Sequence, residues 1–378
     1  CPARAACSEA TCAKVLLQRS RSLGSRTGNR TGRISSQRFS GHWNASSQLN
    51  TSKNHTFPRI HLSNMGQGSC LPYGLPWDEV RCVHFGWKRS TTRQRRVIDA
   101  FAYNGEMDVM EVRRRELAKV VNGTALLITT LNFKGNYRDL PSPPHGGAIQ
   151  HSLLPAEAFE VCRNERGVMD RECSCSMTKN SVADVAEQFD LHDDDWVLFG
   201  DPDEIPNREA VRLLQQCEIP VGPGHTNQVI HFSVLHHYYY DFRCRNNHSK
   251  WAFLNHKTPA AVRASTMRKY GLRVLQAQRP PVCVRVGRYN SCSQYLRRRS
   301  MHLPCAAWHL SSFGGLEQLK NKVRDNADLA HVHLEQFHQC TLQHPWRELV
   351  DRAPEKYPDV PHSVQEDPVR FRSLFRAE

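Results

Sequence analysis

Three acidic residues, Asp201, Asp203 and Glu204, follow closely after the apolar segment WVLF at residues 196–199. An Asp-x-Asp pair on a turn allows two carboxylates to converge on one hard divalent cation, such as Mn²⁺ or Mg²⁺. In open α/β sheets, ligands bind at the carboxyl ends of the strands, so these acids lie where a site is expected. The alternative is a solvated turn, because Asp and Pro are common turn residues.

Strand-like and helix-like segments alternate around this acidic turn. Residues 95–103 and 125–131 form apolar runs typical of buried strands, and residues 106–117 carry apolar side chains at helical spacing. This alternation predicts an α/β fold with a mixed, mainly parallel sheet flanked by helices. Residues 141–180 are expected to form a loop and an irregular insertion. Further strands are expected at residues 196–201 and 228–242, and further helices at residues 181–189, 207–217 and 316–329.

The composition is that of a globular protein of 378 residues with a formal net charge of +14. The charge is divided into blocks, with +9 over residues 1–60, −7 over residues 61–241, +14 over residues 242–316 and −2 over residues 317–378. Because the excess of positive charge does not form one continuous segment, the sequence does not favour nucleic acid as a partner. The expected helix at residues 316–329 has a solvated charged face, and no chemistry is assigned to it.

Four regions follow from these shifts in composition. Residues 1–60 are rich in Ser, Arg, Asn and Thr and are typical of a flexible, disordered basic stem. Residues 61–93 form a connector that contains cysteines, residues 94–345 the main α/β domain, and residues 346–378 a C-terminal tail.

Fourteen cysteines indicate disulfides and therefore a secretory compartment. Structural zinc is the alternative for Cys173 and Cys175, although no second pair stands at zinc-finger spacing. No run approaches the ~20 apolar residues that span a bilayer, and the chain begins with Cys1, so we expect any leader or membrane anchor to precede it. Glycosylation sequons, whose alternative is chance, agree with a luminal protein and lie at Asn29, Asn44, Asn50, Asn54, Asn122 and Asn247.

Four sequence pieces occur in an order and spacing that resemble glycosyltransferase family 17. They are RRVIDAFAYNGEMDVMEVRRREL, LNFKGNYRDL, DDDWVLFGDPDEIPNREAVRLL and AAWHLSSFGG, and together they cover about residues 94–330. The resemblance implies a GT-A-type fold and an inverting transfer of N-acetylglucosamine from UDP-N-acetylglucosamine to a β-linked mannose of a glycoprotein N-glycan, in the bisecting position. It also implies residence in the Golgi lumen on a type II membrane anchor.

The same resemblance implies roles for the acidic turn. Asp203 is expected to bind the metal directly, Asp201 to bind the metal or the donor ribose, and His309 to complete the coordination of a divalent cation, which the resemblance implies to be Mn²⁺. The nucleotide is expected to meet the residues that follow the first strand, namely Asn104, Glu106 and Asp108. Outside this family motif, His309 would be an ordinary structural histidine, and the early motif a helix cap with a solvated face.

Inversion at the anomeric carbon requires a base on the acceptor hydroxyl. No Asp or Glu occurs in residues 242–316, which leaves Asp241 and Glu204 as the candidates for this base. An ion pair with a nearby arginine is the alternative role for Asp241. Basic side chains of the acid-free block are candidates for holding the donor diphosphate, since guanidinium matches phosphate geometry; they include Arg243, Arg285 and Arg288.

The sequence leaves open two other classes of protein and a different acceptor sugar. A polyanion-binding secretory protein would use the basic segments and would bind with a steep salt dependence. A metal-dependent phosphohydrolase would use the same acidic turn on simple phosphate esters. A metal-dependent glycosyltransferase with another acceptor sugar would share the donor site.

Overall fold

The computed structural model describes residues 75–272, apart from residues 92, 133, 140–141, 143–147, 223, 226 and 247–258, together with residues 300–325, 347–349 and 359–375. The expected stem at residues 1–60 lies outside the described residues. None of the described helices combines the length and the apolar character needed to cross a lipid bilayer.

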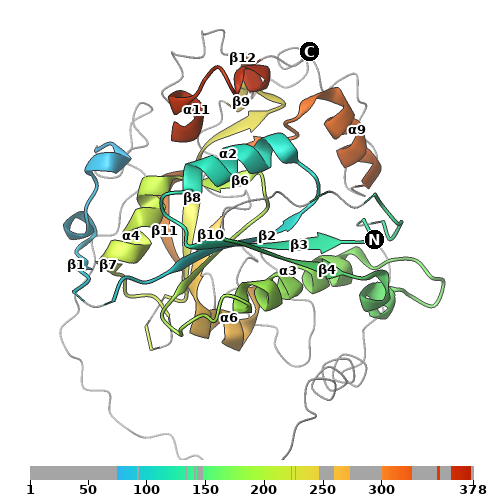
Figure 1. Ribbon diagram of the computed structural model, residues 1–378, viewed down its shortest axis with the longest axis horizontal. Helices are drawn as coiled ribbons and strands as arrows, with labels where there is room; N and C mark the ends of the chain where they lie inside the picture. Colours follow the sequence, from blue (N-terminus) through green and yellow to red (C-terminus); the bar gives the residue numbers. More distant parts are fainter. Residues whose placement is uncertain are drawn as a thin grey trace, which may run out of the picture. The chain divides into compact units, whose positions relative to one another are not determined.

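A large mixed sheet organises the fold (Figure 1). Its first half consists of the four parallel strands β5 (Trp196–Phe199), β2 (Val97–Tyr103), β3 (Gly123–Thr129) and β4 (Ile149–Leu154). Their parallel pairing brings the carboxyl ends of β2, β3 and β5 to one edge. The second half pairs mainly antiparallel, except that β11 (Ser300–Ser311) runs parallel to β8 (Val229–Tyr239) and also pairs with β6 (Glu204–Pro206). In spatial order the strands are β12 (Arg347–Leu349), β9 (Asp241–Asn246), β8, β10 (Ala260–Arg263), β5, β2, β3 and β4.

Helices cover both faces of the parallel half, which confirms the predicted mixed α/β fold. Ile98 and Ala100 of β2 pack with α3 (Arg171–Glu187) on one face. Phe101 and Tyr103 face the other way and pack with Met110 of α2 (Met107–Leu117). Figure 1 shows α2 and α3 on opposite sides of the sheet. Burial on both faces explains why these strands are nearly continuous apolar runs in the sequence.

The prediction of a loop and an irregular insertion at residues 141–180 is wrong over most of the described part of this segment. It contains β4, the 3₁₀ helix η5 (Ala156–Cys162) and the first half of α3, which begins at Arg171 and not at Ser181. Asp170 caps α3 by accepting a hydrogen bond from the backbone N–H of Cys173 at 2.8 Å. The hydroxyl of Thr178 donates to the carbonyl of Ser174 at 2.9 Å, so a polar segment satisfies its hydroxyl groups within the helix.

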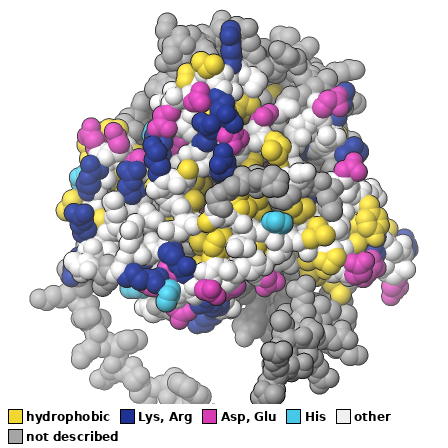
Figure 2. All heavy atoms as spheres, viewed as in Figure 1, with side chains coloured by type: hydrophobic (Ala, Val, Ile, Leu, Met, Phe, Trp, Pro, Cys, Tyr) yellow, Lys and Arg dark blue, Asp and Glu magenta, His cyan; other side chains and the backbone are white. Residues whose placement is uncertain are grey.

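The helix α4 (Arg208–Gln216) begins where predicted, since Asn207 accepts a hydrogen bond from the N–H of Glu209 at 2.8 Å. Its outer face carries ion pairs between neighbouring turns, as does that of α2. On the face shown in Figure 2, basic and acidic side chains are interspersed over α2 and α4 and form no single basic patch there. Paired surface charges of this kind contribute little to stability.

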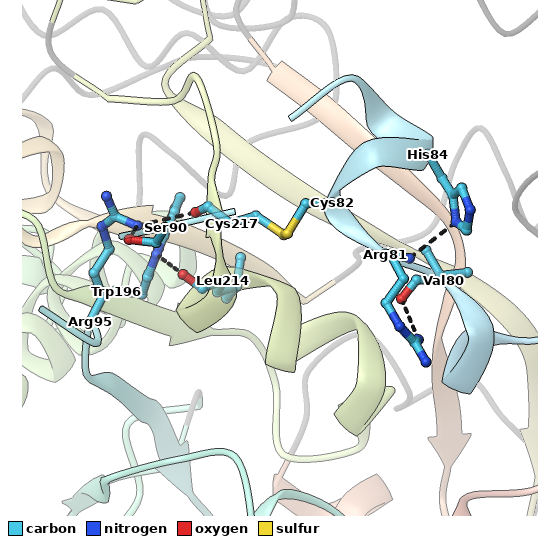
Figure 3. Close-up of a disulfide and its surroundings, with 9 residues drawn as sticks. All are labelled: Val80, Arg81, Cys82, His84, Ser90, Arg95, Trp196, Leu214 and Cys217. Carbon is cyan, nitrogen blue, oxygen red and sulfur yellow. Dashed lines mark hydrogen bonds between the residues drawn. A yellow bond between two sulfur atoms is a disulfide. The ribbon is translucent and has the colours of Figure 1, made fainter. Parts of the chain in front are cut away.

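The segments on either side of the main domain also pack into its core. Trp77 of η3 (Trp77–Glu79) and Trp87 pack against α4, and a disulfide joins Cys82 of η4 (Cys82–Phe85) to Cys217 (Figure 3). At the other end, Phe371, together with side chains of α11 (His362–Glu366) and η8 (Arg372–Phe375), belongs to a cluster with Trp308.

Disulfides are present as predicted. Besides Cys82–Cys217, Cys162 pairs with Cys173 and joins η5 to α3. This bond overturns the alternative in which Cys173 and Cys175 bind zinc. Cys175 is the free thiol among the described cysteines.

Candidate active site

A cavity lies at the carboxyl ends of β2, β3 and β5, where the sequence predicted a site. Its lining includes Asn104 and Glu106 after β2, and Asp201 and Asp203 after β5. The side of α3 that faces the sheet contributes Lys179, and α9 (Gly315–Asp325) contributes polar side chains from a different part of the chain. Four of the predicted site residues therefore meet at one cavity.

Arg113 of α2 holds the acidic turn in place through its guanidinium group. This guanidinium is fully buried and forms a bidentate ion pair with Asp99 of β2, at 2.7 and 2.8 Å. It also donates to the main-chain carbonyls of Asp201 at 3.1 Å and Glu204 at 2.7 Å. Because five donors in a rigid plane reach several acceptors at once, an arginine suits this position better than a lysine.

Glu204 belongs to the same turn, but its side chain does not line the cavity. Its side chain is fully buried, and its Oε2 accepts a hydrogen bond from the backbone N–H of Asp201 at 2.9 Å. Burial, with a contribution from Asp201, raises the pKa of Glu204 to about 7. Gly200 leaves room for this carboxylate, since a Cβ at that position would lie 2.9 Å from Glu204 Oε2.

Asp203 lies between two nitrogen groups. His309 Nε2 is 3.7 Å from Oδ1, and Lys322 Nζ is 3.0 Å from Oδ2. Burial alone would raise the pKa of Asp203, but Lys322 and His309 together hold it well below its usual range. Burial likewise lowers the pKa of His309, and the Asp203 carboxylate outweighs that effect and raises it.

The register of β6 and β11 explains why His309 reaches Asp203. His309 pairs with Glu204 across these strands, and the N–H of Leu310 donates to the carbonyl of Asp203 at 2.8 Å. The ring of His309 stacks on that of His237 with a centroid distance of 4.2 Å. Ser311 Oγ is within hydrogen-bonding distance of both Nε2 atoms, at 3.2 and 2.7 Å, and these contacts fix the orientation of His309.

The early motif of Asn104, Glu106 and Asp108 lies partly at the cavity and partly at the surface. Arg138 donates to Asn104 Oδ1 at 2.9 Å, which joins the motif after β2 to the one after β3. Burial, with a smaller contribution from Asp203, raises the pKa of Glu106, although Lys322 opposes the shift. Glu106 Oε2 is buried and has no hydrogen-bond partner among the described residues. Asp108 is exposed and is not part of the cavity lining.

The second predicted base, Asp241, also lies outside the lining of the cavity. It is buried at the start of β9 and forms an ion pair with Arg243 at 2.9 Å, the arrangement that the sequence left open. Its Oδ1 accepts from the N–H groups of Arg243 and Cys244, at 2.8 and 3.1 Å. These contacts give Asp241 a role in the turn between β8 and β9.

The cations that line the cavity differ from those expected. Arg285 and Arg288 lie outside the described residues, and Arg243 is paired with Asp241. The described cations of the lining are Arg138, Arg171, Lys179 and Lys322. The helix α9 was expected to present a solvated charged face without chemistry, but Lys322 lines the cavity and contacts Asp203. A signal was present in the spacing of Gln318, Asn321 and Lys322, which places three polar side chains on one face of the helix.

Comparison with protein families matches residues 76–272, about half of the chain, to glycosyltransferase family 17. The chain belongs to this family. The matched region contains Arg113, Asp99 and the acidic turn, and it ends before β11 and α9, which carry His309 and Lys322. Comparison with curated proteins gives no match.

Family membership makes the protein an enzyme that transfers a sugar from a donor to an acceptor. A glycosyltransferase uses a nucleotide-sugar donor, and the cavity at the edge of the sheet is where an α/β fold binds such a ligand. The disulfides suggest an enzyme of the secretory pathway.

Proposed function

We propose that this enzyme is an inverting GT-A-type transferase of the Golgi lumen that moves N-acetylglucosamine from UDP-N-acetylglucosamine to a β-linked mannose of an N-glycan. Family 17 includes bisecting enzymes of this kind, and a type II membrane anchor would hold it in that compartment. The observation that carries the proposal is the position of Asp201 and Asp203, which line a cavity at the carboxyl end of β5 with His309 beside Asp203.

Asp203 and His309 would hold a divalent cation in this proposal. A carboxylate oxygen and an imidazole nitrogen suit Mn²⁺, and their 3.7 Å separation allows both to contact one ion. No group of three or more potential ligands occurs among the described residues, so the donor and water would supply the remaining ligands. When bound, the ion would act as a Lewis acid on the leaving diphosphate.

The remaining residues of the cavity are assigned to the donor. Asn104 is held by Arg138, and Asp201 lies 3.4 Å from Lys179, so both are positioned for the polar groups of a nucleotide. Glu204 and Asp241 become positioning residues, because each is buried in a turn outside the cavity lining. Among the described acids of the cavity lining, Glu106 is assigned to neither the metal nor the donor and is left as the proton acceptor.

A donor and acceptor screen tests this function. The enzyme is incubated with Mn²⁺, a biantennary N-glycan and either UDP-N-acetylglucosamine or UDP-galactose, and the products are measured by mass spectrometry. We expect one added N-acetylhexosamine with the first donor and none with the second. Transfer to a different acceptor sugar would correct the acceptor alone.

Two results would contradict the proposal. Hydrolysis of simple phosphate esters without any acceptor would favour the phosphohydrolase. Salt-steep binding of heparin-like polyanions without any sugar transfer would favour the polyanion-binding protein.

A further inference from the structure

Lys322 is the one residue of α9 whose charged group contacts the acidic turn among the described residues. Its side chain lines the cavity, and its Nζ lies 3.0 Å from Asp203 Oδ2. The neighbouring basic residue, Lys320, instead points to solvent and pairs with Glu317 at 2.6 Å. Two lysines of one helix are therefore in different surroundings, and only one of them belongs to the cavity.

The amine of Lys322 has acidic neighbours, since Asp203 Oδ2 lies 3.0 Å away and Glu106 lines the same cavity. Lys322 is thus a half-buried cation at the wall of a cavity. A cation in such a position interacts more strongly with an anionic ligand than a fully solvated one does, because less water screens it.

The chain holds α9 at this position with two further features. Ser312 and Gly314 have positive φ values of 62° and 102°, and they turn the chain sharply between β11 and α9. Lys134, from the loop that follows β3, donates to the carbonyl of Val323 at 3.3 Å. His309 and Lys322 therefore approach the two oxygens of one carboxylate from consecutive elements of the chain.

We propose that Lys322 is a catalytic residue whose ammonium group binds the diphosphate of the donor and stabilises it as it leaves. This inference rests on the proposed nucleotide-sugar donor. In the transfer, the bond between the anomeric carbon and the diphosphate oxygen breaks, and its electron pair stays on that oxygen. The acceptor oxygen forms the new bond, and its proton passes to a base. Lys322 neutralises the charge that develops on the leaving oxygen through a hydrogen bond and keeps its own proton.

The alternative is that Lys322 serves only as the ion-pair partner of Asp203. Both roles require a cation, but they differ in what the diphosphate contacts. A partner of Asp203 alone would affect the affinity for UDP only slightly. A diphosphate-binding group would change that affinity directly, and a small amine that diffuses into the cavity would replace part of it.

The test compares Lys322→Gln, Lys322→Ala and Lys322→Arg with Lys320→Gln as the matched control on the same helix. Calorimetry measures the affinity for UDP, and the transfer assay gives kcat and KM. We expect Lys322→Gln to weaken UDP binding about 10-fold and to lower kcat by about 100-fold, the range seen when a charge-stabilising donor is removed. Lys322→Arg should recover most of the UDP affinity, ethylammonium should restore part of the kcat of Lys322→Ala, and Lys320→Gln should match the wild type.

Unchanged UDP affinity in folded Lys322→Gln, or the absence of amine rescue in Lys322→Ala, would overturn the proposal. Circular dichroism verifies that each variant is folded, and Lys322→Arg provides the comparison if the neutral variants do not fold. If folded Lys322→Arg also lost its affinity for UDP, a positive charge at this position would not be enough to bind the diphosphate, and the proposal would be overturned. Failure of the proposed function would be seen separately, as a wild-type enzyme that transfers no sugar. UDP binding could still be measured in that case, because calorimetry does not depend on turnover.

Discussion

At the scale of single residues, the acidic turn shows that similar side chains take different roles. Asp203 and Glu204 are adjacent in the sequence, yet Asp203 lines the cavity and Glu204 is enclosed behind it. The difference arises from the alternation of side chains where the turn enters β6. A sequence motif identifies both acids, but the backbone decides which one faces the ligand.

We predict that Glu204→Gln retains transfer within about threefold of the wild type, because a glutamine oxygen can still accept the hydrogen bond from Asp201. Loss of a general base would instead cost about 10²- to 10⁴-fold. Initial rates at saturating donor and acceptor measure the difference. A loss of 100-fold or more, in a variant with an unchanged melting temperature, would return Glu204 to the role of base.

At the scale of elements, the central strands and their helices could be predicted because their residues are buried in periodic patterns. The expected strand at 95–103 corresponds to β2, and the expected helix at 207–217 corresponds to α4. The first half of α3 was missed because it is rich in Cys, Ser and Thr, whose side chains hydrogen-bond locally and weaken the apolar period.

The candidate site was predictable only in part. The acids after β2 and β5 could be found, since strand ends are visible in the sequence. His309 was identified only through the family resemblance, because its approach to Asp203 depends on the register of β6 and β11. Lys322 was missed for a related reason: its partner lies on another element, and a charged helix face alone indicates solvent.

A histidine pair on the neighbouring strands β8 and β11 should make stability depend on pH. His231 is buried, its ring stacks on that of His302 at a centroid distance of 5.1 Å, and burial lowers the pKa of both rings. The folded state therefore keeps His231 neutral, whereas the unfolded chain binds a proton below about pH 6.5. Stability from this group is present above that pH and is lost as the pH falls.

We predict that His231→Phe reduces this acid dependence by up to about 1.4 kcal/mol per pH unit below pH 6.5. Urea denaturation between pH 7.5 and pH 5 gives the free energy of unfolding for both proteins. Equal slopes for the variant and the wild type would show that His231 does not remain neutral in the folded state.

At the scale of the whole molecule, segments outside the central α/β domain contribute to its core. The bond between Cys82 and Cys217 spans 135 residues, whereas that between Cys162 and Cys173 spans 11. In the chain-entropy model, a disulfide that closes a longer loop restricts the unfolded chain more. The first bond therefore ties the connector to the end of α4 and should be the more important of the two.

We predict that the double substitution Cys82→Ser and Cys217→Ser lowers the free energy of unfolding by about 2–5 kcal/mol. The double substitution Cys162→Ser and Cys173→Ser should cost less. Chemical denaturation of both variants under oxidising conditions measures the order. A larger loss from the shorter loop would show that local packing, and not chain entropy, dominates.

In the proposed function, Asp203 belongs to the machinery of sugar transfer. The most direct measurement is the rate of transfer from UDP-N-acetylglucosamine to a biantennary N-glycan by the wild type, by Asp203→Asn and by Asp108→Asn. We predict a loss of more than about 100-fold for Asp203→Asn, since even the outer partners of a metal ligand contribute 10- to 100-fold. The exposed Asp108 is the matched control and should leave the rate within about threefold. Wild-type rates in a folded Asp203→Asn enzyme would exclude this role for Asp203.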